Sequence, residues 1–204
     1  MSKELERLYN KMDQETRNNV KQIEKDLTKK YGSVNLREKR KVFPKTWKED
    51  YKKHFNTIHI SDPKDLPYGD NVIYCTSCTG TKSGLDRGTA KQMYAGKLNQ
   101  KFYNHMEEKN IPYGTVSGHL GLVLQHEEFD AYDLHTTDMI FEEILIDYGK
   151  KIAKQCEENG IDTIVFCYSS PLMSEPFIKR LYYASQYTNL KLLYVTKLSI
   201  VGQK

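Results

Sequence analysis

The sequence predicts an α/β protein whose mainly parallel sheet of four to five strands lies between flanking helices, in a Rossmann-like three-layer arrangement. Short apolar runs at residues 71–75, 112–117, 161–168 and 190–196 predict four strands. Segments with helical periodicity separate these runs. Because parallel strands need long crossover connections, this alternation favours parallel pairing with right-handed crossovers.

The spacing of apolar residues predicts a helix in each connection. The first, over residues 89–109, places apolar side chains at four-residue steps: Ala90, Tyr94, Leu98, Phe102 and Met106. The second is expected over residues 137–158 and ends at an Asn-Gly pair, a common helix stop. The third, over residues 174–187, has Pro176 in its first turn.

The first 60 residues are expected to form a helical, basic arm that packs on the main domain. Residues 1–56 hold 12 Lys and 4 Arg against 9 Asp or Glu, a net charge of +7, whereas the remainder carries −3. Such an arm suits nucleic acid or an acidic partner, although Lys- and Glu-rich helices also present solvated faces. The Pro- and Gly-containing residues 61–70 predict a linker, so the α/β domain is expected over residues 61–204.

Composition favours a cytoplasmic protein that does not enter a membrane. The sequence has no run of roughly 20 apolar residues that would span a bilayer. Its N-terminus is charged and has no apolar signal-peptide core. Four cysteines in 204 residues are unlike the dense disulfide framework of small secreted domains. The sequence identifies no cofactor, and it leaves a homo-oligomer open.

Polar residues follow three of the four predicted strands. The carboxyl ends of parallel strands share one edge of a sheet, where ligands bind. The residues expected to bind a ligand there are Ser77, Thr79, Gly80, Thr81 and Lys82 after the first strand, Ser117, Gly118 and Gly121 after the second, and Ser169, Ser170 and Glu175 after the third. The small residues and Lys82 suit a phosphate or another anion. The loop nevertheless lacks the full GxxxxGK[ST] pattern of a P-loop.

Cys78 is the candidate nucleophile, and His119 is its candidate base, because adjacent parallel strands bring their ends close together. Asp133, in an acidic segment, is a candidate general acid or base. A redox pair of Cys75 and Cys78 is an alternative, but such pairs open a helix and Cys75 closes a strand. A zinc site is another alternative, with these candidate ligands: Cys75, Cys78, His119 and Cys167.

Three blocks resemble a family of small uncharacterised α/β domains from bacteria, archaea and phages. The blocks are SCTGTK (77–82), AKQMYAGKLNQKF (90–102) and VSGHLGLV (116–123), with AYD (131–133) after them. The family motifs are C-S/T-x-x-K, A-x-x-x-Y-x-G-x-L-F, S-A-x-x-G-L and P-Y-D. The resemblance does not cover the N-terminal arm. It implies a shared fold and a common site at Cys78, Lys82, Tyr94, Ser117, His119, Gly121, Tyr132 and Asp133.

The chain is also similar to the domain of archaeosine synthase that carries a PCS-x-x-K-like motif and acts on a deazaguanine base in transfer RNA. Here Lys82 lies one residue further from Ser77-Cys78, and no proline precedes the serine. These patterns predict an enzyme, a transferase or hydrolase, that acts on a nucleotide, a nucleobase or a modified nucleic acid. The alternatives are a nucleotide-binding protein without turnover and a nucleic-acid-binding protein that uses the basic arm.

Overall fold

The computed structural model describes residues 57–132, 142–169 and 175–203. These residues belong to the second of the two units into which the chain divides, Thr46–Lys204. The predicted N-terminal arm therefore lies outside the described residues, except for its last four positions.

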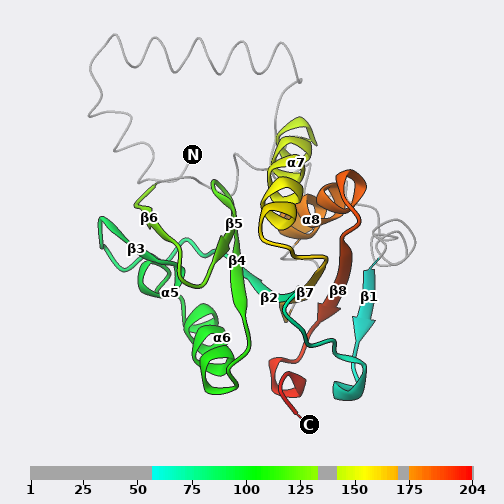
Figure 1. The fold of residues 1–204 in the computed structure, drawn as a ribbon. Coiled ribbons are helices and arrows are strands. Elements are labelled where there is room, and N and C mark those ends of the chain that lie inside the picture. Colours follow the sequence, from blue (N-terminus) through cyan, green and yellow to red (C-terminus); the bar gives the residue numbers. More distant parts are fainter. Residues whose placement is uncertain (1–56, 133–141, 170–174, 204) are drawn as a thin grey trace, which may run out of the picture. The chain divides into compact units, whose positions relative to one another are not determined.

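A six-stranded sheet forms the centre of the domain (Figure 1). The strand order is β1 (Thr57–Ile60), β8 (Lys191–Val195), β7 (Thr163–Cys167), β2 (Val72–Ser77), β4 (Tyr113–Ser117) and β5 (Gly121–Leu124). The first five strands in this order pair in parallel, and β5 is antiparallel to β4. The mainly parallel α/β sheet is therefore confirmed, and its four predicted strands correspond to β2, β4, β7 and β8.

Two strands of the sheet, β1 and β5, were not predicted. The sheet begins with β1, which lies before residue 61, the predicted start of the α/β domain. β5 returns beside β4 after a turn and begins at Gly121, which has φ +83°. A Cβ at this position would lie 2.3 Å from Oε1 of Gln155. Backbone conformation and close packing therefore explain this glycine, which was expected to bind a ligand.

Helices cover both faces of the sheet (Figure 1). On one face, α5 (Ala90–Met93) and α6 (Lys97–Glu108) share a buried apolar cluster with Val72 and Tyr74 of β2. On the other face, α7 (Glu142–Glu158) and α8 (Glu175–Tyr187) share a second cluster with Ile73 and Cys75. Successive residues of a strand point to opposite faces, so this strand contributes to both cores. None of the described helices combines the length and the apolar character needed to cross a membrane.

The helix expected over residues 89–109 is interrupted, and α5 and α6 are separate helices. Tyr94 leaves the helix and forms an isolated antiparallel bridge with Lys82. Gly96 then forms the N-cap of α6. The interruption breaks the four-residue apolar stripe: Phe102 remains buried, whereas Leu98, expected in the core, is 66% exposed.

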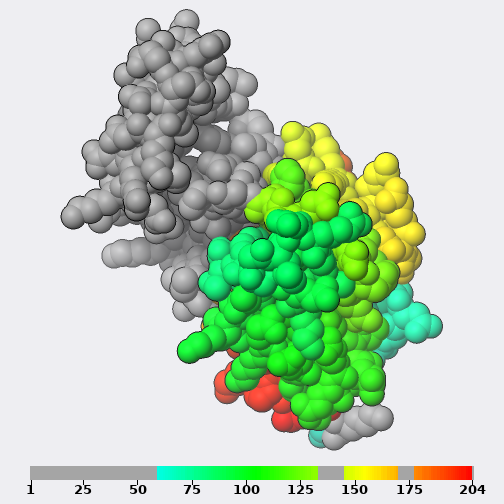
Figure 2. Space-filling model, turned by 90° about the vertical axis from the view of Figure 1, so that its left-hand side faces the viewer, coloured from blue at the N-terminus to red at the C-terminus, as the bar shows by residue number. Residues whose placement is uncertain are grey.

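A two-stranded antiparallel ribbon lies outside the main sheet. β3 (Arg87–Thr89) pairs with β6 (Glu128–Asp130), and the Arg87 guanidinium bonds to Glu128 and Asp130. Figure 2 shows the side of the domain on which this ribbon lies. Part of the acidic segment that leads to Asp133 is therefore a strand whose carboxylates pair with Arg87.

The connections on the two sides of β2 cover opposite faces of the sheet. The chain runs from β2 through α5 and α6 to β4, and then from β5 and β6 through α7 to β7. β7 lies on the other side of β2 from β4. The chain thus diverges between β2 and β7, which makes their carboxyl ends a topological switch point.

The close contact of α7 with α8 yields a stability prediction. A Cβ at Gly149 would lie 2.3 Å from Cβ of Tyr183 and 3.0 Å from the Ala184 nitrogen. We expect Gly149→Ala to destabilise the protein by about 1–3 kcal/mol in urea unfolding, because overpacking outweighs the better helix propensity of alanine. Lys150→Ala, at the next and exposed position, is the control and should change stability by about 0.5 kcal/mol or less. A more stable Gly149→Ala protein would contradict this packing.

Candidate functional site

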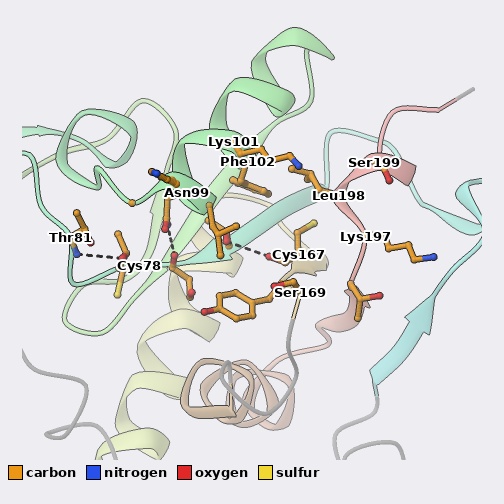
Figure 3. A pocket seen from close by; sticks show the side chains of 18 residues that line it. Cys78, Thr81, Asn99, Lys101, Phe102, Cys167, Ser169, Lys197, Leu198 and Ser199 are labelled. Atoms are coloured by element: carbon orange, nitrogen blue, oxygen red, sulfur yellow. Dashed lines mark hydrogen bonds between the residues drawn. The ribbon is translucent and has the colours of Figure 1, made fainter.

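A cavity of about 530 Å³ lies at the carboxyl ends of β2, β7 and β8 (Figure 3). Its lining residues are 76–79, 81, 96–99, 101, 102, 167–169 and 196–199. Cys78 and Asn99 lie toward β2 and α6, whereas Ser169 and Lys197 lie toward β7 and β8. The cavity thus occupies the switch point, where open α/β sheets bind their ligands.

The N-terminus of α6 borders this cavity because Gly96 has no side chain. A Cβ on Gly96 would lie 3.0 Å from Cγ2 and Oγ1 of Thr79 and 3.2 Å from Oδ1 of Asn99. No side chain of the N-cap bonds to the first turn of α6, and this turn holds no acidic residue. The first N–H groups of a helix have no partner within the helix, so they attract anions.

The rim of the cavity is positively charged. Lys97, Lys101 and Lys197 line it and are exposed. Within the described part of the chain, no Asp or Glu is a lining residue. These lysines and the positive end of the α6 dipole together favour an anionic ligand.

Buried polar groups and aromatic rings form the inner wall of the cavity. Nδ2 of the buried Asn99 donates to the Ser77 carbonyl at 2.7 Å. Oγ1 of Thr76 donates to the Cys167 carbonyl at 3.3 Å. The half-buried Tyr168 ring also lines the cavity and lies within 4° of parallel to the Phe166 ring. A flat aromatic surface beside polar groups suits a planar heterocycle.

Cys78 is the accessible thiol of this site. It is half-buried and lines the cavity, whereas Cys75, Cys156 and Cys167 are buried; all four are free. The Gly118 N–H donates to Cys78 Sγ at 3.3 Å. Burial raises the pKa of the Cys78 thiol, and this effect is partly offset by the Gly118 N–H and by the nearby positive charges of Lys82 and Arg180.

Three hydroxyl groups form a network behind Cys78. The Ser117 hydroxyl lies 2.7 Å from that of Tyr132, which lies 2.5 Å from that of Tyr94. Ser117 Oγ already accepts hydrogen bonds from two backbone N–H groups, so its own proton is directed at Tyr132. The Tyr132 hydroxyl also interacts with Cys78. Burial raises the pKa of Tyr132 to about 12, so this phenol is protonated at neutral pH and can donate a hydrogen bond.

Lys82 and His119 meet this network at Tyr132 rather than in the cavity. Lys82 Nζ lies 4.0 Å from the ring centroid of Tyr94 and 4.5 Å from that of Tyr132, within cation–π distance. The exposed His119 packs its ring on Tyr132, with centroids 5.0 Å apart. A base role for His119 toward Cys78 would therefore require a movement of the ring or a relay through Tyr132.

The structure separates the residues predicted for the site into three groups. The cavity is lined by Ser77, Cys78, Thr79, Thr81 and Ser169. The network behind Cys78 contains Lys82, Tyr94, Ser117, Gly118, His119 and Tyr132. Gly80 is exposed with open space around it, and Gly121 has the structural role given above. Asp133, Ser170 and the side chain of Glu175 lie outside the described residues.

The zinc set considered from the sequence does not assemble. Cys75 packs in the core cluster on the α7 side of the sheet, whereas Cys167 packs in the cluster on the α6 side. In the register of the parallel pair, Cys75 lies opposite Phe166, so Cys167 is one residue out of step and points to the other face. Among the residues that the structure describes, no group of three or more His, Cys, Asp or Glu could hold a metal ion.

Several residues of the site were not predicted from the sequence. Lys97 and Asn99 were assigned to the interior of a longer helix, although Gly96 just before them is a signal for a helix end. Lys197 follows the fourth predicted strand. It could have been predicted, because ligands bind beyond the carboxyl ends of parallel strands. Arg180 lies mid-helix, where the sequence has no signal for its full burial.

No protein-family model matches the sequence, and no curated protein matches it. A solved structure described as AF0587, a protein of unknown function, aligns with a TM-score of 0.39 and 10% sequence identity. The alignment covers 71% of this chain and 42% of that chain.

The four thiols differ in burial and should therefore differ in reactivity, which alkylation with iodoacetamide measures. We expect one thiol to react in the native protein, and Cys78→Ser to abolish this reaction, because the other three cysteines are buried. Since the pKa of Cys78 is raised, the rate should keep rising with pH through about pH 9, where an ordinary cysteine approaches its plateau. Rapid labelling of a second cysteine, or a plateau near neutral pH, would contradict this description.

Proposed function

We propose that the protein is an enzyme, a transferase or hydrolase, that acts on an anionic nucleotide or nucleobase derivative bound in the cavity. One observation carries the proposal: an anion-attracting rim, an aromatic wall and a single accessible thiol belong to the same cavity at the switch point. A volume of about 530 Å³ falls within the range of small-molecule sites.

In the proposed binding mode, the anionic group lies at the first turn of α6. The free N–H groups of that turn and the ammonium groups of Lys97 and Lys101 are its partners. The planar part of the ligand lies toward Tyr168 and Ser169, near the carboxyl end of β7. This placement brings the ligand beside Cys78, which lines the same cavity.

In the proposed reaction, Cys78 Sγ attacks an electrophilic carbon of the ligand. An S–C bond forms, the bond to the leaving group breaks, and the thiol proton passes to the leaving group or to a base. Tyr132 retains its proton at neutral pH and donates a hydrogen bond to the sulphur; where it passes that proton to the leaving group, it takes up the thiol proton in its place. Water or a second substrate then cleaves the S–C bond, which corresponds to hydrolase or transferase activity.

Charge-removing variants test the binding part of the proposal, with nucleoside monophosphates as probes in isothermal titration calorimetry. Lys97→Gln and Lys101→Gln should each weaken binding about fivefold, or about 1 kcal/mol, because each removes one of the two exposed charges that face the anionic group. Lys154→Gln, on the exposed face of α7, is the matched control and should bind as the unchanged protein does. Equal affinity in all three variants, or no binding of any probe, would contradict the proposed site.

Turnover separates the enzyme from its alternatives. After incubation and denaturation, the recovered probe is compared by chromatography between the unchanged protein and Cys78→Ser. Conversion that depends on Cys78 supports the enzyme, whereas intact ligand from both proteins favours a binding protein without turnover. The nucleic-acid-binding alternative depends on residues 1–56, which lie outside the described part of the chain, and it stays a prediction.

A further inference from the structure

Arg180 is a fully buried cation beside the candidate nucleophile. It lies in α8 with an exposed fraction of 0%. Within the described part of the chain, no carboxylate lies within ion-pair distance of its guanidinium. Its Nε is buried and has no hydrogen-bond partner among the residues that the structure describes. Burying a guanidinium costs free energy, and the described partners of Arg180 are two backbone carbonyls and two aromatic rings, so its position calls for a role other than packing.

The hydrogen bonds of Arg180 are directed at the turn between β4 and β5. Nη1 donates to the Ser117 carbonyl at 3.0 Å, and Nη2 donates to the Gly118 carbonyl at 3.3 Å. Tyr148 supports the guanidinium from α7, with 4.5 Å between Cζ and its ring centroid. Two donors in a fixed planar fork hold both carbonyls in one orientation, which the single ammonium of a lysine cannot reproduce.

The turn held in this way supplies the contacts to Cys78. The N–H of Gly118 donates to Cys78 Sγ, and the Ser117 hydroxyl orients Tyr132, which interacts with the same sulphur. Gly118 therefore bonds to Arg180 through its carbonyl and to Cys78 through its N–H. The guanidinium itself also acts on the sulphur as a positive charge.

We propose that Arg180 is a positioning residue that stabilises the thiolate of Cys78: it holds the β4–β5 turn so that the Gly118 N–H and a buried positive charge face the sulphur. This inference rests on the proposed function only in taking Cys78 as the reactive group. The charged and titratable groups around Cys78 come from several elements: Lys82 from its own loop, Arg180 from α8, Tyr132 after β6, Tyr94 between α5 and α6, and Tyr103 in α6. Of these, Lys82 and Arg180 are the cations.

The test is the pH profile of Cys78 alkylation by iodoacetamide in the full chain without ligand. We expect Arg180→Gln to shift the profile to higher pH and to slow alkylation about tenfold at a fixed pH below the pKa, which is a shift of about one pKa unit. Arg180→Lys keeps the charge but loses the fork, so its profile should lie between those of Arg180→Gln and the unchanged protein. Lys154→Gln, an exposed position on α7, is the control for the loss of one positive charge and should not shift the profile.

The outcomes separate positioning from a purely structural role. A folded Arg180→Gln protein, checked by circular dichroism, with an unshifted alkylation profile would overturn the proposal. Loss of the fold in both Arg180 variants would assign the residue to structure alone and would also overturn it. Because no ligand is present, a failure here leaves nucleotide binding in the cavity untouched. Conversely, a cavity that binds no nucleotide would not change the alkylation result.

Discussion

The constraint on which the domain depends is that β2 pairs on both sides with strands reached over opposite faces. β4 follows β2 through α5 and α6 on one face, and β7 is reached through α7 on the other. Every residue of β2 is buried, and its alternating side chains belong to both cores. The segments that leave β2 and β7 therefore run to opposite faces of the sheet, and an open space remains at the carboxyl ends of these two strands. The cavity follows from this topology and not from any single motif.

Cys78 lies where two different environments meet. On one side is the cavity with its basic rim; on the other is the network of Tyr132, Ser117 and the β4–β5 turn. Burial disfavours the thiolate, while the Gly118 N–H and two cations favour it. This balance leaves a protonated thiol in the free protein whose ionisation responds to its surroundings. In the proposed reaction, attack is therefore coupled to loss of the thiol proton and not to a thiolate that exists beforehand.

The sequence predicted those parts of the fold and the site that depend on local pattern. The four apolar runs became parallel strands, and residues after three of them line the cavity. β5 was not predicted because it is a short antiparallel strand that follows a turn containing glycine. Its formation depends on pairing with β4, which the local sequence does not indicate. The predicted helix over residues 89–109 is interrupted where Tyr94 forms a bridge with Lys82. The four-residue spacing of apolar residues does not indicate this tertiary contact. The burial of Arg180 was not predicted because it depends on tertiary packing, which the local sequence does not indicate.

The most direct test of the account is an amide chemical-shift titration of the isotope-labelled protein with a nucleoside monophosphate. The amides of Lys97, Leu98 and Asn99, at the start of α6, are expected to shift together with that of Cys78 and to saturate with one common affinity. The second surface depression, between Met106 and His126 at the opposite end of α6, serves as the internal reference. Shifts confined to that depression, or scattered over exposed lysines without saturation, would contradict the claim that the switch-point cavity is the binding site.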